Sequence, residues 1–300
     1  MDISSRIIIP LITPFDEDFN VDIDAFTRHV ERLYNAGIRY FFPSSSTGEL
    51  DRLDVEEVAL LVNILNDALQ DVHVYPGIFA QGVLDAVSKM DYLEECCDFD
   101  GFIIPTPSYF KYDSDSLYRF YSDILSSTEK EVIIYVIPSN TGILPDPRLY
   151  QRLFDRYRNL AGVKITYNDI TYLEKVLNLM GRSNERFRVY VGSDLLSLPN
   201  LMLGGYGVIP GLGNVFPRLY IEMVSKYHGG DVDEAVKLYR RLAIATHLFD
   251  IPYMFPAVVK YALEVLELGV KRFVRPPMQE VIEKYRSDVL RLLRAYGEFL

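Results

Sequence analysis

The stretch Leu160–Asn168 has the sequence Leu-Ala-Gly-Val-Lys-Ile-Thr-Tyr-Asn, a short apolar run that ends in a lysine. Alternate residues of a strand point to the same face, so Gly162, Lys164 and Thr166 are expected to share one face. Apolar neighbours disfavour an ammonium group and lower its pKa from the usual value of about 10.4. A neutral amine of this kind can attack a ketone and form a Schiff base. The alternative interpretation is an ordinary lysine at the polar end of a strand.

The rest of the chain repeats the pattern around Lys164, in which a short apolar run precedes a segment of helical periodicity. The apolar runs predict eight strands, at Ile7–Leu11, Tyr40–Pro43, His73–Gly77, Gly101–Ile104, Val132–Ile137, Leu160–Lys164, Arg188–Val191 and Gly207–Ile209. The intervening segments predict helices at Asp22–Ala36, Val55–Gln70, Val83–Cys97, Ser114–Ser126, Asp169–Met180 and Pro217–Tyr227, with a loop Pro138–Pro145 and a short helix ending at Tyr157. Eight such units indicate an α/β fold, a (β/α)8 TIM barrel.

A doubly wound open sheet is the competing architecture, and it usually has a glycine-rich phosphate-binding turn after its first strand. Here the corresponding turn, Thr13–Asp16, contains no glycine, which favours the barrel. From residue 231 onward no strand-like run occurs, and helices are predicted at Asp231–Phe249, Tyr253–Leu268 and Met278–Leu300. No proline-, glycine- or serine-rich linker precedes them. We therefore expect a catalytic barrel at 1–228 and a three-helix extension packed on it at 229–300.

The bulk composition limits the class of protein. The chain has 300 residues, 49% of them hydrophobic and 24% charged, and a formal net charge of −11. This balance argues against binding to nucleic acid or to anionic membranes, which requires a basic surface. It also means that an anionic substrate has to be held by local donors. The adjacent Cys96 and Cys97 offer no disulfide framework and no metal-ligand spacing, and we detect no signal peptide or apolar run of membrane-spanning length, so a cytoplasmic location is expected.

Polar residues recur where the predicted strands end, which is where the active sites of such barrels lie. They provide an amine, several hydroxyls and exposed backbone amides, but no cluster of metal ligands. Each has a structural alternative, since serines cap helices, tyrosines pack with a solvated hydroxyl, and an aspartate can cap the next helix. Their repeated placement favours a site made of Ser46, Thr47, Gly48, Tyr109, Tyr135, Lys164, Thr166, Gly192, Asp194 and Ile209.

Several motifs, in order along nearly the whole chain, resemble those of the dihydrodipicolinate synthase and N-acetylneuraminate lyase family of pyruvate-dependent class I aldolases. Ile9–Phe15 resembles the opening strand of the family. Ser45–Glu49 is similar to its Gly-[Ser/Thr]-Thr-Gly-Glu loop, and Tyr135–Gly142 to Tyr-Asn-x-Pro-x-x-Thr-Gly. Gly162-Val163-Lys164 resembles the Schiff-base motif Gly-[Val/Ile]-Lys. The segments Gly192-Ser193-Asp194 and Arg275-Pro276-Pro277 are also in register.

The resemblance implies a role for individual residues. Lys164 would form an imine with pyruvate, and no metal or other cofactor would be needed. Tyr135 would be the proton shuttle, and Ser46 and Tyr109 would complete a hydroxyl relay to solvent. In the family the second tyrosine comes from a neighbouring subunit, which implies a homotetramer built as a dimer of dimers, or a dimer. The amides and hydroxyls of Ser46 and Thr47 would hold the pyruvate carboxylate, as an amide nest can.

Departures from the family pattern bear on the substrate. Asn140 stands where dihydrodipicolinate synthases carry an arginine for the second substrate's carboxylate, and losing that charged donor costs about 1.5–3 kcal/mol of binding. Thr166 is shared with sugar-acid lyases and 2-keto-3-deoxygluconate aldolases, which bind hydroxyl groups. Other residues match neither branch: Ser45, Ser108, Val136 and Ile165.

Three hypotheses follow from these residues. The preferred one is a class I aldolase that reversibly cleaves a 2-keto-3-deoxy sugar acid, such as 2-keto-3-deoxygluconate, to pyruvate and an aldehyde. The alternative is a 4-hydroxy-tetrahydrodipicolinate synthase that condenses pyruvate with aspartate semialdehyde. The third is a non-catalytic barrel that binds a keto acid, which the combination of lysine, tyrosine and hydroxyl relay disfavours.

Overall fold

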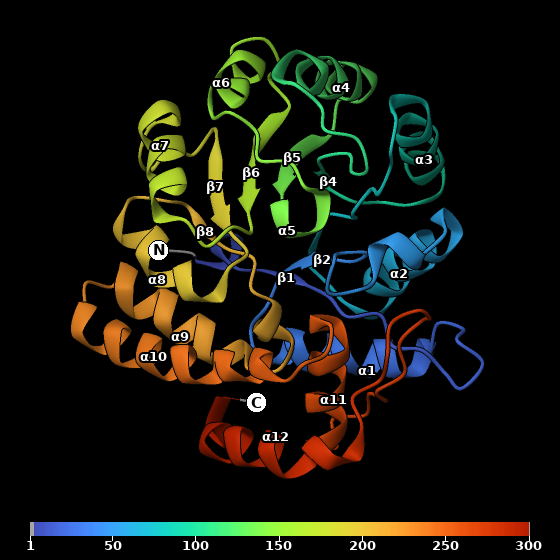
Figure 1. The fold of residues 1–300 in the computed structure, drawn as a ribbon, viewed down its shortest axis with the longest axis vertical. Coiled ribbons are helices and arrows are strands. Elements are labelled where there is room, and N and C mark those ends of the chain that lie inside the picture. Colours follow the sequence, from blue (N-terminus) through green and yellow to red (C-terminus); the bar gives the residue numbers. More distant parts are fainter. Residues whose placement is uncertain (1–2, 300) are drawn as a thin grey trace.

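Eight short parallel strands form the centre of the computed structural model, which describes residues 3–299 (Figure 1). Each strand pairs with the next one along the chain. Bridges between Gly77 and Ile103 and between Ile7 and Val208 connect β3 to β4 and β8 to β1, so the sheet closes into the predicted barrel. The strands are β1 (Ile8–Pro10), β2 (Tyr40–Phe42), β3 (His73–Val74), β4 (Gly101–Pro105), β5 (Glu131–Val136), β6 (Leu160–Ile165), β7 (Arg188–Val191) and β8 (Gly207–Val208).

Helices surround this barrel, and aspartates begin several of them. The side chains of Asp22, Asp54, Asp113 and Asp169 accept backbone amide hydrogen bonds at the helix starts, which satisfies donors that have no partner within the helix. The surrounding helices are α1 (Ile23–Asn35), α2 (Val55–Ala68), α3 (Val83–Cys96), α4 (Ser114–Ser127), α6 (Arg148–Phe154), α7 (Ile170–Met180) and α9 (Pro217–His228), with short helices α5 (Pro138–Thr141) and α8 (Ser197–Met202) between strands.

The register of the strands sets which side chains meet inside the barrel. Tyr135 on β5 is the register partner of Lys164 on β6, and Lys164 is the partner of Tyr190 on β7. Two residues earlier on each strand, the same register aligns Ile133, Gly162 and Arg188. A Cβ on Gly162 would lie 2.1 Å from the backbone oxygen of Arg188, so only glycine fits there. Lys164 therefore points into the barrel, as the alternation of the strand predicts.

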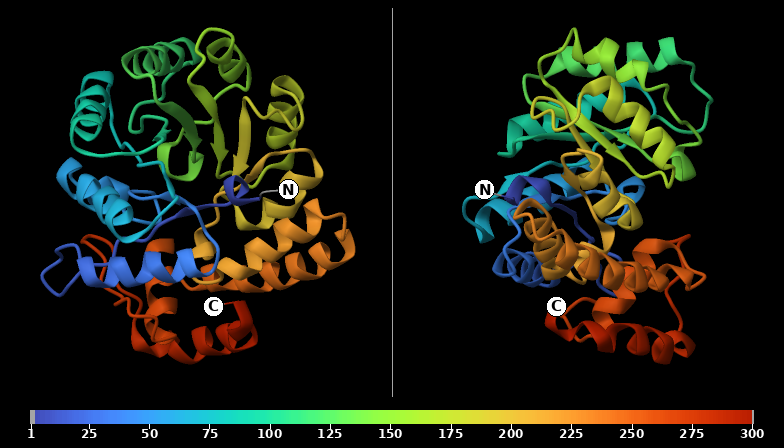
Figure 2. Two further views of the ribbon diagram at one scale, coloured as in Figure 1. Left: turned by 180° about the vertical axis from the view of Figure 1, so that it is seen from behind. Right: turned by 90° about the vertical axis from the view of Figure 1, so that its left-hand side faces the viewer.

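The chain after α9 packs along one side of the barrel (Figures 1 and 2). It contains α10 (Val232–Ala245), α11 (Phe255–Val265) and α12 (Arg286–Leu293). We keep the division into 1–228 and 229–300 as a proposal; Met1, Asp2 and Leu300, which these ranges include, lie outside the described residues. No single helix within residues 3–299 has the length and apolarity to cross a membrane, and one bent pair, Val232–Asp250 with Phe255–Val265, passes that test on length and composition only.

Most predicted bounds differ from the structure by up to about four residues, and two predictions differ in kind or by more. The loop predicted at Pro138–Pro145 begins with the helical turn α5, in which proline occupies a first-turn position that needs no amide donor. The helix predicted from Met278 begins only at Arg286. In the preceding segment the backbone oxygen of Val281 accepts a hydrogen bond from the Arg272 guanidinium at 3.2 Å instead of a helical amide. Helical periodicity does not register such contacts.

Candidate active site

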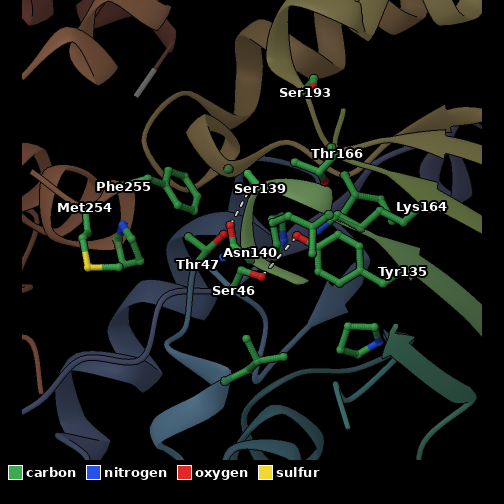
Figure 3. A pocket seen from close by; sticks show the side chains of 18 of the residues that line it. Ser46, Thr47, Tyr135, Ser139, Asn140, Lys164, Thr166, Ser193, Met254 and Phe255 are labelled. Carbon is green, nitrogen blue, oxygen red and sulfur yellow. Dashed lines mark hydrogen bonds between the residues drawn. The ribbon is translucent and has the colours of Figure 1, made fainter. Parts of the chain in front are cut away.

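A cavity of about 710 Å³ opens at the carboxyl ends of the strands. Its floor holds Lys164, Tyr135 and Ser46, and its outer wall includes Met254 and Phe255 from the C-terminal part of the chain (Figure 3). Nine of the eleven residues predicted for the site line this cavity: Ser46, Thr47, Tyr135, Asn140, Lys164, Thr166, Gly192, Asp194 and Ile209. Polar residues that follow different strands in the sequence thus meet in one cavity.

Lys164 is buried among aromatic rings. Its side chain leaves the residue only 3% exposed, and its Nζ lies 4.0 Å from the centre of the Tyr135 ring and 4.9 Å from that of Phe42. Within the described part of the chain no ion pair or hydrogen bond holds this nitrogen. Burial lowers the pKa of Lys164 to about 7, and the charge of Asp194 opposes this shift. Near neutral pH a large share of the amine is therefore unprotonated and nucleophilic.

Gly192 makes room for this lysine. A Cβ on Gly192 would lie 2.8 Å from Cε of Lys164 and 2.1 Å from the Thr166 hydroxyl. Any side chain there would displace the amine or the hydroxyl. The glycine that the sequence places at the end of β7 is thus required by the close approach of β6 and β7, which explains its position without a substrate contact.

A short hydroxyl chain lies beside the amine. The Tyr135 hydroxyl is 3.2 Å from the Ser46 hydroxyl, and this contact is drawn in Figure 3. Burial raises the pKa of Tyr135, while the hydroxyls of Ser46 and Thr166 act in the opposite direction. Thr166 Oγ1 is itself buried and makes no hydrogen bond to another described residue. Tyr135 is therefore a neutral phenol at pH 7, able to donate a proton and to pass it to Ser46.

The loop after β2 presents backbone amides to the cavity. Ser44 and Glu49, which flank the loop, have positive φ angles of 50° and 62°. Gly48 N donates to the Ser45 oxygen at 2.9 Å, whereas the amides of Ser46 and Thr47 donate no hydrogen bond within the part of the chain that the structure describes. Two adjacent free amides beside two hydroxyls form a concave donor set that suits a carboxylate.

The loop after β2 is held in place by a buried ion pair between Glu49, at the end of the loop, and Lys260 on α11. Glu49 and Lys260 have fully buried side chains, and Lys260 Nζ lies 2.6 Å from Glu49 Oε1. The second carboxylate oxygen accepts from the backbone amide of Arg275 at 2.9 Å, and Lys260 also donates to the Phe273 oxygen at 2.8 Å. The Arg275 guanidinium in turn pairs with Glu57 on α2. The Glu49 carboxylate is thus held by two separate segments, through Lys260 and through the backbone amide of Arg275.

Asp194 lies in the same cavity with a defined partner. The Tyr220 hydroxyl on α9 donates to its carboxylate, and burial raises the pKa of Asp194 to about 6. Asp194 does not cap the following helix, which was the structural alternative for it. The short 3-10 turn Asp194–Leu196 begins at Asp194 itself and has no side-chain cap. Its carboxylate instead stabilises the protonated form of Lys164.

Two predicted site residues do not line the cavity. Gly48 is packed under the loop, where a Cβ would lie 2.6 Å from the Leu11 oxygen. Tyr109 is 89% exposed and has a φ of 74°. Its ring is 4.9 Å from that of Phe110, which is 65% exposed. Within a single chain, Tyr109 therefore does not approach Tyr135 or Ser46.

Sequence reasoning did not single out several residues that line or support the cavity. Ser139 and Asn168 follow β5 and β6, and their positions at strand ends could have identified them. Lys260 lies in an apolar run of α11 in which every residue from Pro256 to Leu263 is buried, and this isolated charge was a usable signal. Other residues come from the helical extension and gave no such signal: Thr246, Phe249, Met254 and Phe255.

Comparisons with known proteins cover nearly the whole chain. Residues 3–296 match the sequence model described as the dihydrodipicolinate synthetase family. A DapA-like lyase of Thermofilum pendens is 31% identical over 97% of each chain, and a 4-hydroxy-tetrahydrodipicolinate synthase of Methanopyrus kandleri is 29% identical over 97% of this chain and 96% of its own. YagE, a prophage protein of E. coli K12 solved with pyruvate, superposes with a TM-score of 0.92 at 24% identity over 98% of both chains. Within residues 3–299, no three or more His, Cys, Asp or Glu side chains are grouped as metal ligands.

A substitution in the buried pair of Glu49 and Lys260 tests whether this pair holds the loop after β2 in place. Replacing Lys260 by methionine leaves the Glu49 carboxylate buried without its partner, which we expect to cost about 3–5 kcal/mol of unfolding free energy. The freed loop should also bind pyruvate more weakly. Urea unfolding and pyruvate titration measure both effects. Lys226→Met, which removes an exposed pair with Asp231, is the matched control and should change neither. An unchanged unfolding free energy in Lys260→Met would contradict the proposed anchor.

Proposed function

This chain belongs to the dihydrodipicolinate synthetase family of carbon–carbon lyases, and from that premise we propose that it forms an imine between Lys164 and pyruvate and reversibly cleaves a 2-keto-3-deoxy sugar acid. One observation carries the proposal. The Lys164 amine is buried without an ion pair, its pKa is lowered to about 7, and it lies 4.0 Å from the ring of a buried tyrosine. Desolvation in an apolar pocket is one way in which a lysine is activated to form a Schiff base, and the nearby phenol can carry the protons of that reaction.

In this proposal the neutral amine of Lys164 attacks C2 of the keto acid. Tyr135 gives its phenolic proton to the carbinolamine hydroxyl, which leaves as water, and the cationic imine remains. The amides of Ser46 and Thr47 hold the carboxylate. The C4 hydroxyl then loses its proton to the Tyr135 oxygen, the C3–C4 bond breaks, and its electron pair enters the imine as an enamine. Protonation of C3 and addition of water release pyruvate and the amine.

The part of the cavity that Asn140 lines favours a substrate whose aldehyde half is uncharged. Asn140 replaces the expected cationic residue, and its side-chain oxygen accepts from the Ser139 hydroxyl at 2.9 Å. The cationic side chains that line the cavity within the described residues are Lys164 and Arg52, and Arg52 is paired with Asp51 at 2.5 Å. Hydroxyl and amide groups are suited to hydroxyls on the substrate. A carboxylate at this end would lack a free bidentate partner.

The second candidate is 4-hydroxy-tetrahydrodipicolinate synthase. The Methanopyrus kandleri relative that carries this name supports it. It would use the same imine at Lys164, followed by attack of the enamine on aspartate semialdehyde. Asn140 argues against efficient use of that substrate, since the second carboxylate would be held by neutral groups only.

In this proposal Tyr109 acts in the active site of a neighbouring subunit. Its exposed ring and that of Phe110 form an apolar projection that a neighbouring subunit would cover. We place Tyr109 in the relay of that neighbour, next to the Ser46 hydroxyl, in a cytoplasmic homotetramer or dimer. The absence of Tyr109 from the cavity of its own chain is consistent with this arrangement.

Reductive trapping tests the imine. Incubation with pyruvate and sodium borohydride should add one pyruvate-derived group to the protein, and peptide mass spectrometry should locate it on Lys164. The Lys164→Ala variant should gain no adduct and lose aldolase activity. Lys260→Arg serves as a second buried-lysine variant that retains Lys164 and should still be labelled. Binding of pyruvate without any adduct would favour the non-catalytic barrel instead.

An aldehyde panel tests the substrate class. With pyruvate, we expect glyceraldehyde to be turned over at least tenfold faster than aspartate semialdehyde, because the aldehyde end of the cavity offers neutral donors. Asn140→Arg should reverse part of this preference by supplying a carboxylate partner. Product analysis by chromatography and mass spectrometry measures both reactions. Faster turnover of aspartate semialdehyde by the unmodified chain would select the synthase alternative.

A further inference from the structure

A second cavity, of about 350 Å³, lies on the outside of the barrel between α1 and the start of α9. It shares no lining residue with the active-site cavity. Three of its six lining residues are arginines, and the others are one glutamate, one asparagine and one alanine: Arg28, Arg32, Arg218, Glu31, Asn35 and Ala36. The chain has 31 basic and 42 acidic residues, so a local excess of positive charge is unusual for it.

None of these arginines makes an ion pair with another described residue. Arg32 is the most constrained, since its Nε and Nη1 atoms are buried and have no hydrogen-bond partner. Burial lowers the pKa of Arg32 to about 10, with no carboxylate acting against the shift. A guanidinium stays protonated at neutral pH even so, and buried charges of this kind are normally paired. The structure therefore contains a cation whose counter-ion the described residues do not supply.

The Arg32 side chain is also fixed in the cavity wall. Its Nη2 atom donates to the backbone oxygen of Asn214. The side chain of Asn214 is bound in turn by the backbone of Ile12, Pro10 and Gly211, at 3.2, 2.9 and 2.9 Å, and by His29 Nε2 at 3.0 Å. This anchorage holds the guanidinium in place, so the entropy lost on binding a ligand is small.

Neighbouring groups do not neutralise the charge. His29 is fully buried and burial lowers its pKa to about 3, so its ring is neutral at pH 7. Helix α9 begins at Pro217 beside the cavity, and no side chain caps its N-terminus, which adds partial positive charge. Glu31 contributes one negative charge against three positive ones. The electrostatic character of the cavity is thus that of an anion site.

We propose that this cavity binds a small oxyanion, a phosphate or carboxylate group, between the guanidinium groups of Arg32, Arg28 and Arg218. Guanidinium groups donate two parallel hydrogen bonds to either kind of oxyanion, and their planar geometry matches both. The site lies apart from the imine chemistry, so it stands or falls independently of the function proposed above.

Calorimetric titration with inorganic phosphate tests the proposal, with sodium chloride at equal ionic strength as the reference for non-specific screening. The full-length protein should bind phosphate, and Arg32→Gln and Arg218→Gln should each weaken the binding at least tenfold. Arg158→Gln, at an exposed arginine that lines neither cavity, is the matched control and should leave the affinity unchanged. Any phosphate held by the amide loop of the active site would be equally retained in all variants.

A parallel titration with succinate distinguishes a carboxylate ligand from a phosphate ligand, and binding of either one that depends on Arg32 and Arg218 supports the site. Thermal unfolding confirms that the variants are folded, and Arg218, which is exposed, can be replaced without disturbing the core. Heats that equal those of sodium chloride, or an affinity that is the same in all variants, would overturn the proposal.

Discussion

The desolvation of one amine is the constraint on which the rest of the site depends. Lys164 Nζ lies against the rings of Phe42 and Tyr135 and forms no ion pair with another described residue, so its protonated form is disfavoured. This placement follows from the barrel itself. The register pairs Tyr135 with Lys164, and Gly192 leaves the space that the lysine side chain occupies. The closed sheet supplies the low-dielectric surroundings, and the strand ends supply the hydroxyls that move protons in the proposed reaction.

The C-terminal helices are part of this arrangement although they contribute no strand. Lys260 on α11 and the backbone of Arg275 bind the Glu49 carboxylate, and Glu49 holds the end of the loop whose amides face the cavity. A buried ion pair gives little net stability but is costly to break. We interpret it as a device that fixes one loop conformation. Met254 and Phe255 form the outer wall of the cavity from the same region, so these helices help to shape the cavity.

Much of this could be predicted from the sequence, and the rest depends on contacts that are distant along the chain. The period-two alternation around Lys164 correctly gave the shared face of Gly162, Lys164 and Thr166, because it is a local property of a strand. The partner of Glu49 lies 211 residues away, and no local pattern reports that distance. The late start of α12 goes with the bond from the Arg272 guanidinium to the Val281 oxygen, which helical periodicity does not report either. Local periodicity does not report the exposure of Tyr109 either; only the family resemblance, which gives this tyrosine to a neighbouring subunit, leads one to expect it.

The pKa of Lys164 is the most direct measurement of the central claim. Only the neutral amine reacts with an acylating or reductively methylating reagent, so the labelling rate of Lys164, followed by peptide mass spectrometry, rises with pH and levels off above its pKa. Because burial lowers that pKa, we expect a midpoint near pH 7. A midpoint near the ordinary lysine value of about 10.4 would contradict the account, since the amine would then be charged and unreactive at neutral pH.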